Sequence, residues 1–188
     1  LFLSKTIYAS LLALLFLFIN YTYPFIPIQM TLINSLTIGI PAFILALEPN
    51  KSRVKGRFFI NVISKAIPSG ITTVVNILLL VFVASLLNIP NEQTSTIAVI
   101  ITAYTAILLI YRISKPLNLL RKSLLVLLTG IFLVMILTPI GRSIFSLEWL
   151  TPNSLLILLP LMYISTRLFK LLSNLLNMVI KKKSNWFI

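Results

Sequence analysis

The sequence predicts an all-α integral membrane bundle of six transmembrane helices, with both termini in the cytoplasm. Of its 188 residues, 59% are apolar and only 10% are charged, so a water-soluble surface could not be covered. The mean hydropathy is +1.05. The apolar residues form uninterrupted runs close to the ~20 residues that a helix needs to cross ~30 Å of hydrocarbon. Continuous rather than alternating runs favour helices over barrel strands.

Six such runs follow one another along the chain, separated by short polar or basic stretches. They cover residues 7–19, 26–47, 71–89, 94–113, 123–140 and 150–166. The connections that would lie on the outer side are too short to form an extracellular domain. The sequence therefore predicts a bundle with little mass outside the membrane on that side.

The positions of the basic residues predict the orientation. If the termini are cytoplasmic, every one of the 16 Lys and Arg residues except Arg142 falls in a cytoplasmic segment. Positive residues gather on the cytoplasmic side of membrane proteins, where they contact anionic lipid headgroups. The net charge of +13 is thus explained by orientation, and no nucleic-acid partner is expected.

Two basic segments, residues 53–68 and 167–180, carry apolar residues at helical spacing and are expected to lie along the cytoplasmic interface. They would anchor the protein to headgroups or dock a cytoplasmic partner domain. The anchoring residues we expect are Lys51, Arg53, Lys55, Arg57, Lys181, Lys182 and Lys183.

Missing residue types exclude most catalytic chemistry. The chain has no Cys and no His, and its three acidic residues are Glu48, Glu92 and Glu148, so it has no Asp. Nucleophile–His pairs, zinc sites, paired-carboxylate sites and an aspartyl-phosphate cannot be built from it. We expect no catalytic residue and no cofactor in this chain.

The second apolar run carries the most polar residues near its middle. Asn34 and Thr37 are followed at once by Gly39 and Pro41. Because Pro41 has no N–H, an unwound turn is expected there, exposing the carbonyls of Thr37 and Ile38 beside the two polar side chains. Such broken helices bind cations in transporters. The alternative is that Asn34 and Thr37 only hydrogen-bond to neighbouring helices.

This run resembles the sixth transmembrane helix of cation-transporting P-type ATPases. The matching residues are Pro27, Gln29, Asn34, Thr37, Gly39, Pro41 and Ala42, in the same order and spacing. The stretch from Leu45 to Phe58 is closer to the bacterial branch called cation-transporting ATPase E, and the opening Phe2-Leu-Ser-Lys5-Thr-Ile-Tyr8 resembles the preceding helix of that branch.

The resemblance implies that the chain holds the fifth to tenth helices of a pump in the bacterial plasma membrane. Residues 1–47 would form two ion-pathway helices, 48–70 a basic cytoplasmic loop with an interfacial helix, 71–166 four supporting helices and 167–188 a basic amphipathic tail. Asn34 and Thr37 would contact the transported cation, Gly39 and Pro41 would unwind the helix, and Thr6 and Ser10 would supply ligands from the preceding helix. Ile38 stands where calcium pumps carry a carboxylate, which argues against calcium-like coordination.

The resemblance also implies partners that this chain lacks. The upstream helices and the cytoplasmic domains that bind Mg-ATP would complete the pump, and a chain that starts at Leu1 and contains no Asp is expected to be a fragment without ATPase activity of its own. The alternative is a stand-alone small polytopic membrane protein, either a channel or an assembly scaffold.

Overall fold

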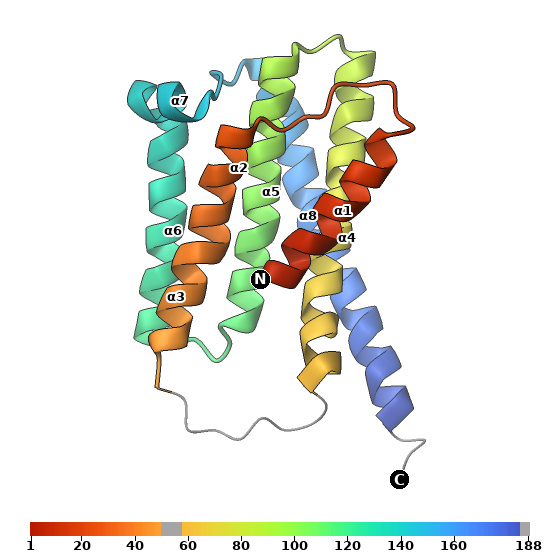
Figure 1. The fold of residues 1–188 in the computed structure, drawn as a ribbon, viewed down its shortest axis with the longest axis vertical. Coiled ribbons are helices and arrows are strands. Elements are labelled where there is room, and N and C mark those ends of the chain that lie inside the picture. The colour runs from red at the N-terminus through yellow and green to blue at the C-terminus, as the bar shows by residue number, and fades with distance from the viewer. Residues whose placement is uncertain (50–57, 185–188) are drawn as a thin grey trace.

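A computed structural model describes residues 1–49 and 58–184, and within these ranges all regular secondary structure is helical (Figure 1). None of the seven expected anchoring side chains is described. Lys51, Arg53, Lys55 and Arg57 lie outside the described residues, and so do the side chains of Lys181, Lys182 and Lys183. The elements are α1 (Phe2–Phe16), α2 (Pro27–Asn34), a π-helical turn η1 (Ser35–Gly39), α3 (Ile40–Leu47), α4 (Phe58–Leu86), α5 (Asn91–Ile113), α6 (Leu119–Leu137), α7 (Pro139–Phe145) and α8 (Pro152–Ser184).

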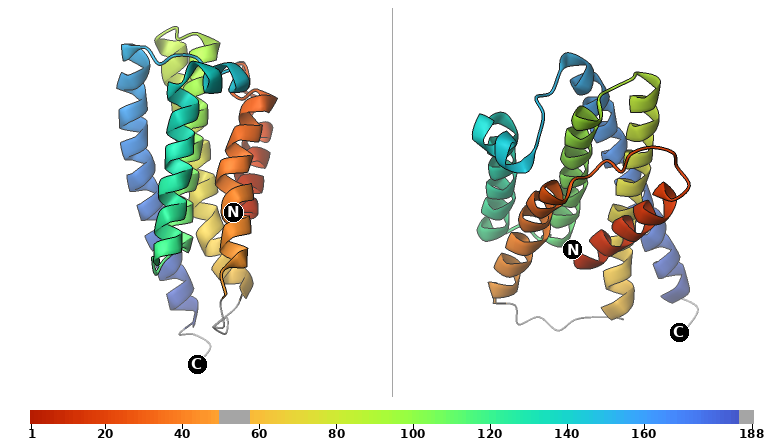
Figure 2. Two further views of the ribbon diagram at one scale, coloured as in Figure 1. Left: turned by 90° about the vertical axis from the view of Figure 1, so that its left-hand side faces the viewer. Right: turned by 45° about the horizontal axis from the view of Figure 1, so that its top comes forward.

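The bundle is organised around α5. This helix packs against α4 and α8, while α1 crosses α4 and the α2–η1–α3 segment lies beside α6 (Figure 1). Every residue of α5 from Thr94 to Ala103 is buried. The long helices run roughly parallel, and the short α7 lies across the end of α6 (Figure 2). The core is therefore formed by α4, α5 and α8, and the ion-pathway segment predicted from the sequence packs on its side.

Five segments are long and apolar enough to cross a membrane, by length and composition. They are Pro27–Leu47, Phe59–Leu86, Asn91–Ile113, Leu119–Leu137 and Pro152–Ile180. The prediction of an all-helical membrane protein is thus confirmed. Helix α1 has 15 residues, or about 22 Å at ~1.5 Å per residue, which is short of the hydrocarbon thickness. The sixth span and the orientation of the termini stay predictions.

In their described parts, the two amphipathic segments are not separate helices, and residues 53–57 of the first lie outside the described residues. Residues 58–68 form the first turns of α4, and residues 167–180 continue α8 without a break. Helix α4 passes through Pro68, where the side chains of Ser64, Ala66 and Ser69 are buried. Because packing against neighbouring helices holds this turn in place, the loss of one backbone hydrogen bond at Pro68 does not end the helix.

The N-terminal end of α2 is fixed by Gln29, whose side chain is fully buried. Its Oε1 accepts hydrogen bonds from the Ile26 N–H (3.2 Å) and from the Ser95 hydroxyl of α5 (2.6 Å). Its Nε2 donates to the carbonyl of Ser146, just after α7 (2.9 Å). One amide thus joins three segments that are far apart in the sequence.

The opposite end of the same segment is fixed by Glu48, directly after α3. Its carboxylate accepts from Arg121 Nε at 2.8 Å and from the side-chain amide of Asn118, at the start of α6. Arg121 also donates to the carbonyls of Ser114 and Pro116, in the α5–α6 connection. Hydrogen bonds from Arg121 and Asn118 hold the pKa of the Glu48 carboxyl below its ordinary value. The α2–η1–α3 segment is therefore held to α5 and α6 at both ends.

Gly70 allows α1 to approach α4 closely. A Cβ placed on Gly70 would lie 2.6 Å from Ile7 Cγ2 and 3.3 Å from the carbonyl oxygen of Ser4. A side chain there would push α1 away from α4, so this glycine determines how near the polar residues of α1 come to α4 and η1.

Candidate functional site

The α2–α3 segment contains a π-helical turn where the sequence predicts an unwound one. The N–H of Ile40 bonds to the carbonyl of Ser35, five residues back, instead of the four-residue spacing of an α-helix. The segment continues as α3 with Pro41 in its first turn. The helix is therefore widened at this turn and not broken. The unwinding role of Gly39 and Pro41 stays a prediction.

The widened turn changes which backbone oxygen loses its partner. In an α-helix the carbonyl of Leu36 would accept a hydrogen bond from the Ile40 N–H. In a continued π-helix it would accept one from the N–H of residue 41. Here Ile40 bonds to Ser35, and Pro41 has no N–H. The Leu36 carbonyl therefore has neither of these two donors. The sequence had instead predicted exposed carbonyls at Thr37 and Ile38.

The two polar side chains predicted on this segment differ in their surroundings. Thr37 is buried, and its hydroxyl donates to the carbonyl of Ile33 at 2.8 Å. Asn34 is half-buried, and its Oδ1 is a buried atom without a hydrogen-bond partner in the described part of the chain. Because a buried polar oxygen is normally paired, the Asn34 amide is available to a ligand or a water molecule.

A small cavity lies where η1, α1, α4 and α5 meet. Its volume is about 10 Å³, which is room for about one water molecule. Thr37 and Ile38 line it from η1. The other polar residues that line it are Ser4, Lys5 and Tyr8 of α1, Ser69 and Thr73 of α4, and Thr102 of α5. Four elements thus bring polar side chains to one point inside an apolar bundle.

Hydrogen bonding in the cavity is incomplete. Among the described residues, the Tyr8 hydroxyl and Thr102 Oγ1 are buried and have no partner. Thr37 and Thr73 donate their protons to carbonyls of their own helices, at 2.8 and 3.0 Å. The lone pairs of those two hydroxyl oxygens therefore stay free to accept a hydrogen bond or to bind a cation. Unpaired polar atoms in a low-dielectric interior are costly, so this cavity is the candidate site in the described part of the chain.

Lys5 gives the cavity its formal charge. It is half-buried at one wall, and no carboxylate is among the lining residues. An ammonium group nearby weakens the binding of any further cation in a medium of low dielectric constant. A cation held here would need compensating negative charge from outside the lining set.

The structure does not bring the predicted Thr6 and Ser10 to this site. Both are exposed on α1, and Thr6 Oγ1 donates to the carbonyl of Phe2 at 3.2 Å. The face of α1 that meets the bundle carries Ser4, Tyr8 and Leu12 instead. Their spacing of four residues is a helical face that sequence reasoning could have found, whereas the contributions of Ser69, Thr73 and Thr102 depend on packing between helices.

A second group of polar contacts joins α8 to its neighbours. Asn76 of α4 is fully buried and donates through Nδ2 to the Ser165 hydroxyl at 2.7 Å. At the next residue of α8, the hydroxyl of Thr166 is 2.7 Å from that of Tyr104 on α5. These bonds connect α8 to α4 and α5 and lie apart from the cavity at η1, so they are packing contacts.

These features describe a multi-pass membrane protein with a polar cavity at a distorted transmembrane helix. The chain is 33% identical over 162 residues to the calcium-transporting ATPase CtpE of Mycolicibacterium smegmatis, which covers 79% of this chain and 20% of that protein. It is 36% identical over 163 residues to CtpE of Mycobacterium bovis, with the same coverage of 79% and 20%. No protein-family model matches the chain.

A third relative extends the match. The chain is 29% identical over 180 residues to the probable cation-transporting ATPase exp7 of Streptococcus pneumoniae, covering 92% of this chain and 23% of that protein. The resemblance to cation-transporting P-type ATPases is thereby confirmed, and it extends over most of the chain. The chain spans about a fifth of the length of these relatives. With its apolar helices and bacterial relatives, it is a multi-pass protein of the bacterial plasma membrane.

Proposed function

We propose that this chain is the membrane half of an ATP-driven cation pump and that the cavity at η1 is part of its ion pathway. The observation that carries the proposal is the convergence of unpaired hydroxyls at a π-helical turn, in a segment that resembles cation-transporting ATPases. A distorted transmembrane helix with polar atoms at its middle is a common architecture for a cation site in transporters.

In this proposal six spans cross the membrane and both termini are cytoplasmic. Residues 1–47 form two ion-pathway helices, 48–70 contain a basic cytoplasmic loop, 71–166 support them, and 167–188 form a basic tail. The clustering of positive charge supports this orientation. The basic residues would contact the anionic headgroups of the cytoplasmic leaflet.

Neutral oxygens of this chain would contact the transported cation. Thr37, Tyr8 and Thr102 carry buried hydroxyls and line the cavity, and Asn34 adds an unpaired amide oxygen. Divalent cations such as calcium favour carboxylates among their ligands. We therefore propose that the compensating carboxylates come from helices outside this chain, which the relatives' greater length can supply.

The pump would take its energy from Mg-ATP bound elsewhere. P-type chemistry passes through a phosphorylated aspartate, and this chain contains no Asp. The chain by itself is therefore proposed to be inactive, with the upstream helices and cytoplasmic domains as its partners. Measurable ATP hydrolysis by the isolated chain would contradict this part of the proposal.

The proposal is tested by Thr37→Val in the complete protein, reconstituted into liposomes. Loss of the hydroxyl should raise the cation concentration for half-maximal ATPase activity. Thr129→Val is the matched control, because Thr129 donates to the carbonyl four residues back at the same 2.8 Å but is exposed on α6. Equal cation dependence of the two variants would mean that Thr37 only packs.

The second candidate is a stand-alone small membrane protein, either a channel or an assembly scaffold. The similarity to cation-transporting ATPases does not favour it. Sequencing the coding region upstream of Leu1 separates the two, since a pump requires an aspartyl-phosphorylation motif there.

A further inference from the structure

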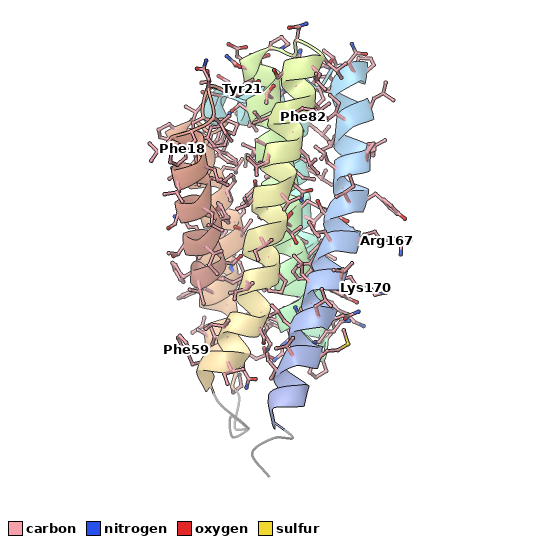
Figure 3. The ribbon with its side chains drawn as sticks, turned by 90° about the vertical axis from the view of Figure 1, so that its right-hand side faces the viewer. Phe18, Tyr21, Phe59, Phe82, Arg167 and Lys170 are labelled. Atoms are coloured by element: carbon pink, nitrogen blue, oxygen red, sulfur yellow. The ribbon has the colours of Figure 1, made fainter. Side chains whose placement is uncertain are left out.

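Helix α8 carries a polar stripe on a face that no other described helix covers. Tyr163, Arg167, Lys170 and Asn174 are all exposed. Their spacings of four, three and four residues place them on one side of the helix. Arg167 and Lys170 project from the outer side of α8, away from the bundle (Figure 3). Exposed leucines border the stripe, including Leu159, Leu171 and Leu175.

Contacts with α5 show how far the stripe lies from the C-terminal end of that helix. Thr166 is hydrogen-bonded to Tyr104, while Ser173 and Asn177 accept hydrogen bonds from Arg112. Tyr104 and Arg112 are eight residues apart on α5, or about 12 Å at ~1.5 Å per residue. Arg112 lies next to the C-terminal end of α5. Because Arg167 directly follows Thr166, it lies about 12 Å further from that end than Arg112 does.

The cations of the stripe have no anionic partner in the described part of the chain. Arg167 Nε donates to the Tyr163 hydroxyl at 3.0 Å, and its guanidinium lies 5.0 Å from the centre of the Tyr163 ring. Both partners are neutral. The ion pair found among the described residues is Arg121–Glu48, on other helices. A cation on a lipid-facing helix without an anion is costly, so an anion supplied from outside the chain would stabilise it.

We propose that this stripe binds the phosphate group of an anionic phospholipid in the cytoplasmic leaflet. A phospholipid fits both parts of the surface, because its phosphate pairs with Arg167 and Lys170 while its acyl chains lie on the flanking leucines. Long basic side chains reach from within the hydrocarbon to the headgroups. Arg binds phosphate with two parallel donors, and Lys adds a point charge.

The inference rests on the proposed orientation, which places this end of α8 on the cytoplasmic side. Its central claim, preference for an anionic lipid at these residues, does not depend on that orientation. In detergent micelles both faces of the protein are equally accessible to added lipid. Labelling of the termini from either side of intact cells reports the orientation separately. A wrong orientation can thus be distinguished from an absence of preference for anionic lipid.

The test measures lipid retention by the complete protein with native mass spectrometry in detergent. Phosphatidylglycerol is the anionic probe, and phosphatidylcholine is the zwitterionic reference. Each charge near the headgroups contributes roughly a fivefold change in affinity. The variant Arg167→Gln/Lys170→Gln should therefore lose phosphatidylglycerol binding by roughly tenfold or more, with phosphatidylcholine binding unchanged.

Two controls decide how the result is read. Lys122→Gln removes an exposed cation from α6, outside the stripe, and should leave binding intact. Arg167→Lys keeps the charge and should retain most of the affinity. Equal loss in Lys122→Gln would mean that only diffuse charge attracts lipid, which overturns the proposal. No preference for phosphatidylglycerol in the unmodified protein overturns it as well. So does a concentration-dependent dimer that the double variant loses, because a second copy would then be the occupant.

Discussion

The packing of α1 against α4 can be tested with a single methyl group at Gly70. The Cβ of an alanine there would lie 2.6 Å from Ile7 Cγ2 and 2.9 Å from Ile7 Cβ. Carbon atoms in ordinary contact are ~3.5–4.0 Å apart, so the helices must separate by about 1 Å. Ile7 is branched at Cβ and has few alternative rotamers, so α1 itself has to move.

The magnitude follows from two opposed terms. Inserting a methyl group into a filled contact costs about 1–3 kcal/mol. Replacing glycine by alanine inside a helix contributes about 0.5–1 kcal/mol of stabilisation. We expect Gly70→Ala to be destabilised by about 1–2 kcal/mol. Gly130→Ala is the matched control, because no heavy atom lies within 4 Å of a Cβ at that position.

The assay is the unfolding free energy of the complete protein in one detergent. It is measured for both alanine variants, for Ile7→Ala alone and for Ile7→Ala in the Gly70→Ala background. Removing Ile7 Cγ2 should restore part of the lost stability, so the two substitutions should be coupled in a double-mutant cycle. Because Ser4 and Tyr8 move with α1, the cation dependence of ATPase activity in the complete protein should also change. Equal stability of Gly70→Ala and Gly130→Ala, or additive effects at Ile7 and Gly70, would refute the reasoning.

Three further predictions concern other parts of the bundle. The Glu48 carboxyl has a lowered pKa, so its contact with Arg121 stabilises the fold above the ordinary glutamate pKa and is lost as the pH falls through the lowered value. Acid unfolding curves of Glu48→Gln should lack this pH-dependent component, and curves that superimpose on the unmodified protein would contradict the assignment. Asn76→Ala should cost about 1 kcal/mol and be coupled to Ser165→Ala in thermal unfolding, whereas additive losses would exclude their bond as the cause. Lys5→Gln should increase the apparent cation affinity severalfold in ATPase assays of the complete protein, since it removes a positive charge from the cavity.

Much of the fold could be predicted from the sequence because lipid leaves few choices to the backbone. An uninterrupted apolar run of sufficient length must be helical, and each of the five long helices contains most of one of the six predicted runs. Two of them extend well beyond their runs, α4 at its start and α8 at its end. The amphipathic segments were harder, because helical periodicity does not reveal whether a helix lies along the interface or continues a span. Residues 58–68 and 167–180 turned out to be continuous with α4 and α8.

The candidate site was predictable only along one helix. Thr37, Gly39 and Pro41 could be singled out from the sequence, because proline lacks a backbone N–H in any fold and so always removes one helical hydrogen bond. Thr6 and Ser10 were expected to join them but face away from the bundle. Which polar residues of α1 turn inward depends on the rotation of that helix, and contact with Gly70 contributes to it.

The sequence by itself determined that this chain crosses a membrane and that it cannot form an aspartyl-phosphate, and it predicted an unwound turn near Pro41. Composition, apolar run length and missing residue types are properties of the chain alone. Only the tertiary structure decided that the distortion is a π-helical turn, and that Tyr8 and Thr102 meet Thr37 at one cavity. Those features depend on how helices rotate and approach one another, and that is determined by packing between residues far apart in the sequence.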